Sequence, residues 1–279
     1  MQVFDAAMKH WPDRSDRCVE TDFGHTVASV AGHASSTDVL PPLVLLQGGG
    51  STIAAWAEFV RSWSRERQII AVDTLWEAGR SVQLRPVDNG SQAAEWLEQV
   101  LAGLGVDRAH IAGYSYGAWL ALNHAAKAPT RILSVTAIEP IAAITPMPLR
   151  AWWRMIRMLM GGEKSYRAYL QWTRGGSLPE SAMLEVLLSS RAGYQQWGTP
   201  RPMRLTKAEW QSLSLPTSIV LGGQSGMVPT RKATETLRAV APQAEVHVLP
   251  QSSHAVLIDE PNWIEHQIGL FMNRNDRTR

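Results

Sequence analysis

Short apolar runs alternate along this chain with longer segments of helical spacing. Each run is apolar at successive positions rather than at every second position, which is typical of a strand covered on both faces. Such runs are found at 43–46, 68–72, 109–112, 132–138, 218–221 and 245–249. Helical spacing is found at 51–64, 91–104, 115–127, 230–240 and 261–272. The alternation predicts an α/β chain, in which a mostly parallel sheet has helices on both faces.

The rhythm changes between residues 141 and 214, where no strand pattern is present. Three helical pieces are expected there instead, and glycine pairs or a Gly-Thr-Pro turn separate them. These pieces cover 149–160, 164–173 and 179–197. We therefore expect a core domain built from residues 1–140 and 215–279, with a helical cap of residues 141–214 inserted into it.

The expected cap has an unusual composition. It holds five of the 12 Trp and six of the 10 Met, and its ten Lys and Arg residues against four Glu give it a charge of +6. One interpretation is that the Trp and Met side chains pack onto the sheet domain. The other is that the inner face forms an apolar substrate wall, to which Trp152, Trp153 and Met155 would belong.

Overall composition narrows the remaining classes of protein. The chain has 279 residues and a formal net charge of +2, which gives no argument for a nucleic-acid partner. No window approaches the roughly 20 apolar residues needed to cross a bilayer, and the first residues lack the apolar stretch of a secretory signal. Cys18 is the single cysteine, so an internal disulfide and a cysteine zinc cluster are excluded. We expect a cytoplasmic protein with no membrane partner, metal or cofactor.

The sharpest local signal is Gly113-Tyr114-Ser115-Tyr116-Gly117, which follows an expected strand and opens an expected helix. In that context a serine between two glycines indicates a nucleophile on a tight strand-to-helix turn. The helix start offers free backbone N–H groups to a developing negative charge. Ser115 is the predicted nucleophile.

A serine hydroxyl needs a base, and His254 is the best candidate among eight histidines. It lies on a short polar loop directly after the last expected strand. Residues that follow the carboxyl ends of parallel strands gather at one edge of a sheet. We therefore expect His254 to meet Ser115.

Together these features resemble the α/β-hydrolase superfamily, and more narrowly its bacterial carboxylesterase-like serine hydrolases. The resemblance rests on the glycine-rich loop at 48–50, Trp56 beyond it, the elbow, the insert and the terminal histidine loop. It implies an eight-stranded sheet, a cap inserted after strand 6 over the active site, and the chain order serine, acid, histidine.

Two departures from that pattern affect the site. The family's glycine-rich loop usually begins His-Gly, whereas this chain has Gln47-Gly48. Backbone N–H groups can still bind the oxyanion, and we assign those of Gly49 and Tyr116 to it, with Gly50 adjacent. Many relatives also place an aspartate after the strand at 218–221, where this chain has no carboxylate and carries Ser225 instead.

The acid that orients His254 must therefore come from elsewhere. Glu139 ends the strand next to the nucleophile strand and is our first choice, although it could instead bond a backbone amide in its own turn. Asp259 is the fallback, but its position suggests the N-cap of the last helix. Asp73 also ends a strand, and its counterpart in the family is generally structural.

Several aromatic residues follow strand ends and are candidates for the pocket. Trp56 and Trp76 are expected near its entrance, and Tyr116 either lines it or packs. Gly50 of the glycine-rich loop is also expected to line the pocket. Glu77 is an added charge to which the sequence assigns no role.

These residues predict a metal-independent serine hydrolase of carboxylic esters or lactones with an apolar or aromatic body. A serine at position 115 argues against dehalogenase or epoxide hydrolase chemistry, which needs a carboxylate nucleophile. Three alternatives stay open: a thioesterase or acyl-transferring cyclase with an acyl carrier partner, a non-catalytic ligand receptor, and proton-transfer chemistry that uses His254 alone. A homodimer is equally open.

Overall fold

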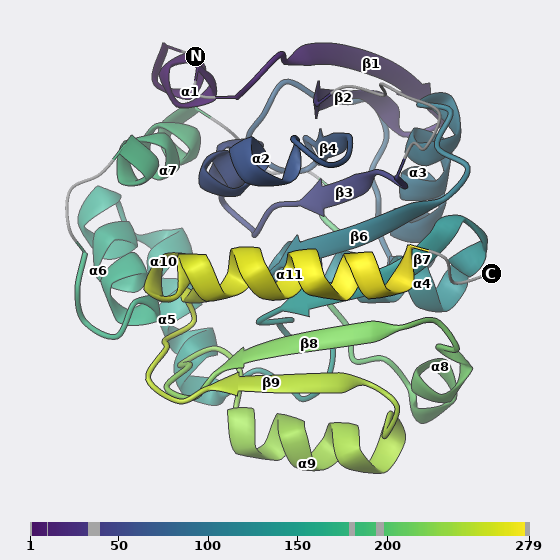
Figure 1. Cartoon of the computed structure of the whole chain (residues 1–279). Coiled ribbons are helices and arrows are strands. Elements are labelled where there is room, and N and C mark those ends of the chain that lie inside the picture. Colours follow the sequence, from purple (N-terminus) through teal and green to yellow (C-terminus); the bar gives the residue numbers. More distant parts are fainter. Residues whose placement is uncertain (1, 10, 33–39, 179–181, 194–197, 277–279) are drawn as a thin grey trace.

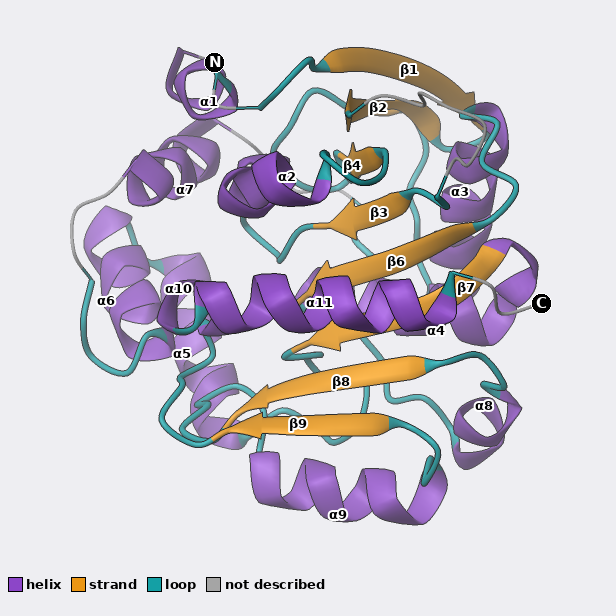
Figure 2. Ribbon diagram, in the orientation of Figure 1, coloured by secondary structure: helices purple, strands orange, loops and turns teal. Residues whose placement is uncertain are grey.

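The computed structural model describes residues 2–9, 11–32, 40–178, 182–193 and 198–276. One sheet has the strand order β1-β2-β4-β3-β6-β7-β8-β9, and the short strand β5 pairs with β2 (Figures 1 and 2). The strands are β1 (Ser15–Thr21), β2 (Gly24–Ala31), β3 (Leu43–Leu46), β4 (Ile69–Val72), β5 (Val82–Gln83), β6 (Ala109–Tyr114), β7 (Ile132–Ile138), β8 (Thr217–Gly222) and β9 (Glu245–Leu249). Strand β2 pairs antiparallel with β1, β4 and β5, and all the other pairs are parallel. The predicted mostly parallel α/β sheet is confirmed, and β5 makes it nine strands rather than eight.

Both faces of the sheet are covered because its strands are apolar at successive positions. Leu43 and Leu45 of β3 join one buried cluster, and Val44 and Leu46 join the other. Helices α2 and α11 lie on the first face, and α3 and α4 lie on the second (Figure 1). The core helices are α1 (Gln2–Met8), α2 (Ala57–Trp63), α3 (Gly90–Gly103), α4 (Tyr116–Lys127), α9 (Thr230–Val240), α10 (Val256–Asp259) and α11 (Pro261–Asn275), with 3-10 turns at Ile53–Trp56 and Pro129–Arg131.

The segment expected to form the cap contains α5 (Leu149–Met160), α6 (Glu163–Thr173), α7 (Ala182–Gly193) and α8 (Lys207–Ser212). Helices α5, α6 and α7 gather at the carboxyl ends of the parallel strands, whereas α8 lies at the opposite end of the sheet (Figure 1). The ends of the predicted 179–197 helix fall at 179–181 and 194–197, outside the described residues. Across the described part of the chain, no helix combines the length and the apolar character that crossing a bilayer requires.

Candidate active site

Ser115 sits on a strained turn between β6 and α4. Its φ of 54° and ψ of −110° lie outside the regions that L-residues ordinarily adopt. A Cβ on Gly113 would lie 2.1 Å from the Gly117 carbonyl oxygen, and one on Gly117 would lie 2.3 Å from the Leu46 carbonyl oxygen. Only glycine fits at either position, which explains the spacing around the serine. The Ser115 N–H donates to the Ile138 carbonyl at 2.8 Å and ties the turn to β7.

Ser115, His254 and Glu139 form one hydrogen-bonded line. His254 Nε2 lies 3.0 Å from Ser115 Oγ, and His254 Nδ1 lies 2.6 Å from Glu139 Oε2. A carboxylate only accepts, so the Nδ1–H of a neutral imidazole donates to Glu139 and Nε2 is left to accept from the serine hydroxyl. All three side chains are buried. The arrangement therefore has a nucleophile, a base and an anion within direct reach of one another.

The loop that carries His254 is fastened from three sides. The Tyr114 hydroxyl donates to the His254 carbonyl at 3.0 Å, and the His254 N–H donates to the carbonyl of Thr173, the last residue of α6. Asp259 accepts from both the backbone N–H and the hydroxyl of Ser253 at 2.7 and 2.6 Å. Burial raises the pKa of the Tyr114 phenol far above its ordinary value, so Tyr114 acts as a neutral donor.

Glu139 is completely buried at the end of β7, with a left-handed φ of 53°. Its Oε1 accepts from the Gly222 N–H at 2.7 Å, and its Oε2 accepts from Ser225 Oγ at 2.5 Å as well as from His254. The Ser225 oxygen in turn accepts from the backbone N–H groups of Met227 and Val228, which leaves its proton for Glu139. The sequence showed Ser225 as the position of a missing acid; the structure makes it a hydrogen-bond donor to the acid that is present.

The two alternative acids contact other groups. Asp73 lies beside Arg80, and burial raises its pKa to about 6. Asp259 ends α10 and holds Ser253, so the expectation that it caps the last helix is wrong: Glu260 precedes that helix at Pro261. Across the described residues, no group of three or more His, Cys, Asp or Glu is placed to ligate a metal.

The glycine-rich loop lies against the start of α4. A Cβ on Gly49 would be 3.5 Å from the Tyr116 Cβ, so the two backbones run close together. Tyr116 is the first residue of α4, where a backbone N–H has no acceptor within the helix. The buried Glu77 accepts from the Gly50 N–H at 2.7 Å and so fastens this loop.

Gln47, at the position where the family resemblance implied a histidine, is buried. In the amide orientation that satisfies both groups, its nitrogen donates to the Val72 carbonyl at 2.8 Å and its oxygen accepts from Thr74. Gln47 thus links the exits of β3 and β4.

The aromatic residues expected at the pocket have different positions. Trp56 is fully buried in the core, with its ring 6.0 Å from Phe59 and 6.5 Å from Trp63, so its role is packing. Trp76 is also fully buried, between Trp96 and Tyr116. The Tyr116 hydroxyl donates to the Pro200 carbonyl at 2.5 Å and joins α4 to the segment after α7.

The cap residues expected to form the substrate wall lie on α5. Trp152 and Trp153 are 46% and 67% exposed, and Met155 is half-buried. Helical spacing shows that α5 has an apolar face but not what this face covers, and here most of that face points to solvent.

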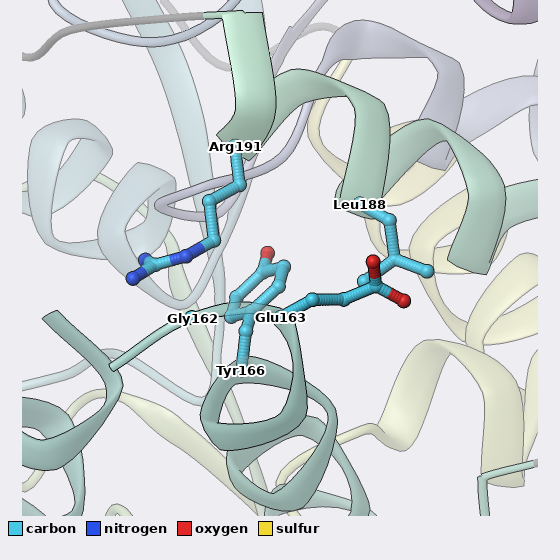
Figure 3. Close-up of a pocket in the computed structure, with 5 residues that line it drawn as sticks. All are labelled: Gly162, Glu163, Tyr166, Leu188 and Arg191. Atoms are coloured by element: carbon cyan, nitrogen blue, oxygen red, sulfur yellow. The ribbon is translucent and has the colours of Figure 1, made fainter.

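The cap helix that meets the site is α6. Its Tyr166 hydroxyl lies 3.4 Å from the Gly50 carbonyl, its Tyr169 hydroxyl lies 3.5 Å from the Met227 sulfur, and its Trp172 ring packs on Gly226. Burial raises the pKa of Tyr166 to about 12. Figure 3 shows Tyr166 at the base of a pocket between α6 and α7, with Arg191 and Leu188 above it. The regular spacing of Tyr166, Tyr169 and Trp172 is the sequence signal that could have identified this face.

Comparison with known proteins agrees with this geometry. A family model described as alpha/beta hydrolase fold matches residues 41–192. Carboxylesterase YbfK of Bacillus subtilis (strain 168) is 23% identical and the alignment covers 97% of this chain and 92% of that protein. The crystal structure of carboxylesterase CesB (YbfK) from Bacillus subtilis has a TM-score of 0.88 at 22% identity, covering 97% of this chain and 96% of that one. For naproxen esterase from Bacillus subtilis the TM-score is 0.88 at 20% identity, covering 97% and 95%. With the family model matching more than half of its residues, the chain belongs to the α/β-hydrolase fold family.

Proposed function

We propose that this protein is a serine hydrolase that cleaves carboxylic esters through an acyl-enzyme intermediate. The observation that carries the proposal is the continuous line Ser115–His254–Glu139, with 3.0 and 2.6 Å between successive polar atoms. Two relatives with carboxylesterase in their names cover nearly the whole chain, which supports an ester as substrate.

The geometry supports a sequence of two half-reactions. His254 Nε2 takes the proton from Ser115 Oγ as the oxygen attacks the ester carbonyl, and the imidazolium that forms is stabilised by Glu139. The N–H groups of Gly49 and Tyr116 bind the negative oxygen of the tetrahedral intermediate. His254 then protonates the leaving alkoxide, and water activated by the same nitrogen hydrolyses the acyl-enzyme.

The substrate class follows from what borders this line. Tyr166, Tyr169 and Trp172 bring aromatic surface to the glycine-rich loop and to the loop after β8. We propose an ester or lactone whose acyl or alkoxy part is apolar or aromatic and packs against this face of α6. In this proposal Tyr166, Tyr169 and Trp172 line the pocket. They take the place that the sequence suggested for Trp56, Trp76, Trp152 and Trp153.

Covalent labelling tests the proposal. We expect a fluorophosphonate probe to modify the wild-type protein at Ser115, with loss of p-nitrophenyl ester hydrolysis in parallel. Ser115→Ala abolishes both labelling and turnover. Ser252→Ala is the matched control, because Ser252 is a buried serine on the same side of the molecule and its hydroxyl has no hydrogen-bond partner within the described residues.

Two results would contradict the proposal. Full ester turnover in Ser115→Ala would assign the reaction to His254 acting without acylation. Absence of labelling in the folded wild type would favour a ligand receptor. An acyl thioester in the same panel measures whether thioesters are cleaved faster than oxygen esters.

A further inference from the structure

Helix α5 exposes an apolar face to solvent. Twelve large hydrophobic side chains are exposed within the described residues, and half of them lie on this one helix of 12 residues. They are Leu149, Trp152, Trp153, Ile156, Leu159 and Met160, with exposed fractions between 39% and 85%. Contiguous apolar surface of this kind marks an interaction site in a soluble domain.

The helix is divided into three sectors around its axis. At 100° per residue, Ala151, Met155 and Met158 fall on one side, where Ala151 is fully buried and the two methionines are half-buried. The six exposed apolar residues occupy the next arc. A third arc contains the helix's three arginines, all of them exposed, and Arg154 also lies over the Trp172 ring at 4.9 Å.

We propose that α5 docks this face on an anionic lipid surface. A strongly amphipathic helix with arginines beside an apolar arc, and with indole rings in that arc, has the pattern of a helix that lies in the plane of a lipid interface. The apolar side chains enter the acyl boundary, the Trp rings sit at headgroup level, and the arginines contact phosphate. This proposal runs against the expectation from the sequence that the protein has no membrane partner.

The charges favour lipid over a second copy of the chain. α5 contains no acidic residue, and the segment 141–214 has ten basic residues against four acidic ones. Two α5 faces packed against each other would bring arginines of like sign together, with no carboxylate on either helix to neutralise them. An anionic headgroup layer supplies the missing negative charge.

The position of α5 also gives the docked protein an orientation. α5 lies with α6 and α10 at the carboxyl ends of the strands (Figure 1), which is the end of the sheet where β6 leads to Ser115. A protein bound through α5 would turn this end towards the lipid. The inference stands independently of the reaction proposed for Ser115.

Vesicle partitioning of the full chain tests the proposal. We expect co-sedimentation with vesicles of phosphatidylcholine mixed with phosphatidylglycerol, much weaker binding to phosphatidylcholine alone, and loss of binding as salt is raised. The double variant Leu149→Glu/Met160→Glu should weaken partitioning at least about tenfold. Arg150→Gln/Arg157→Gln should weaken it about fivefold for each charge removed, on the anionic vesicles only.

Leu270→Glu is the control, because it places one such negative charge at a half-exposed leucine of another long helix, α11. Circular dichroism and hydrolysis of a small soluble ester report whether each variant is folded. Wild-type binding that does not distinguish the two vesicle types, or binding that survives in Leu149→Glu/Met160→Glu, overturns the proposal. The proposal is also overturned if light scattering shows that the wild type is a dimer and that Leu149→Glu/Met160→Glu is a monomer. In that case a second copy of the chain covers this face of α5.

Discussion

Glu139 holds the Nδ1–H of His254 with an oxygen that also accepts the Ser225 hydroxyl, and its other oxygen accepts the Gly222 N–H. Because the side chain has no exposed surface, these donors replace the water that an exposed carboxylate would bind. The negative charge can then stabilise the imidazolium that forms when Ser115 attacks.

Replacing this carboxylate tests its role directly. Glu139→Gln keeps the size of the side chain but removes the charge and presents an amide to His254. We expect kcat for ester hydrolysis to fall by about two orders of magnitude or more, as the loss of a triad acid can cause. Glu235→Gln, an exposed site on α9, should leave kcat unchanged. A loss smaller than about threefold would place the acid elsewhere.

Ser225 should matter through Glu139 rather than by touching substrate. Ser225→Ala removes the hydrogen bond to a buried carboxylate, a kind of bond worth about 1.5–3 kcal/mol. We expect the free energy of unfolding in urea to fall by about that amount and kcat to fall about tenfold, while the fluorophosphonate probe still labels Ser115.

Ser252→Ala provides the comparison, since its hydroxyl has no partner within the described residues. If the two serine variants lose the same stability and activity, the bond between Ser225 and Glu139 has no special weight.

At the scale of secondary structure elements, Arg191 joins two cap helices to a third. From α7 its guanidinium donates to the carbonyls of Met158 and, at 3.0 Å, Gly161, which belong to the last turn of α5 and the residue after it. It also stacks on the Tyr166 ring of α6 at 5.0 Å. The last carbonyls of a helix lack partners within it, so a cation here satisfies them.

Arg191→Leu should therefore loosen the end of α5 more than it lowers global stability. We expect faster amide hydrogen exchange at 157–162, with a change of less than about 1 kcal/mol in the free energy of unfolding. Arg238→Leu, on the last turn of the core helix α9, is the control that removes an exposed arginine without touching the cap. Unchanged exchange at 157–162 would show that α5 is held by its apolar contacts instead.

Elements were more predictable than their surroundings. The strand at 43–46 and the helices at 149–160 and 230–240 have the bounds that apolar runs and periodicity indicate. Residues that follow the carboxyl ends of parallel strands meet at one edge of a sheet. This rule also selected residues 115, 139 and 254, which the structure brings together. The role of Ser225 depends on how the loop after β8 crosses the end of β7. The exposure of Trp153 depends on which face of α5 packs against the rest of the protein. Both are long-range packing outcomes, which local patterns do not contain.

For the whole molecule, a buried polar cluster fastens the C-terminal helix at the end of the sheet opposite the active site. His110 of β6 lies 2.7 Å from Ser134 Oγ of β7 and 3.0 Å from Asp276, the residue after α11. Arg67 pairs with the same aspartate at 2.8 Å. Burial lowers the pKa of His110, helped by the charge of Arg67, while the cluster lowers the pKa of Asp276.

These shifts make stability depend on pH in a definite direction. Below the unfolded-state value of 6.5 the unfolded chain protonates His110 more readily than the folded chain does, so protonation favours unfolding. The stability contribution of neutral His110 is complete above that pH and is lost as pH falls towards the lowered folded pKa. Buried His124, whose pKa burial also lowers, acts in the same direction. Asp73, with its pKa raised to about 6, acts in the opposite one.

A variant isolates the histidine, because Asp276, the group coupled to it, has a lowered pKa and stays ionised between pH 7.5 and 5.5 in the folded protein. We expect the wild-type free energy of unfolding, measured in urea, to decrease between pH 7.5 and 5.5, by at most about 1.4 kcal/mol per pH unit for each such histidine. His110→Gln keeps hydrogen-bonding capacity but cannot titrate, so it should be less stable at pH 7.5 and show a shallower decline. Parallel curves for the two proteins would mean that His110 binds the same number of protons in the folded and the unfolded state, which would contradict the prediction.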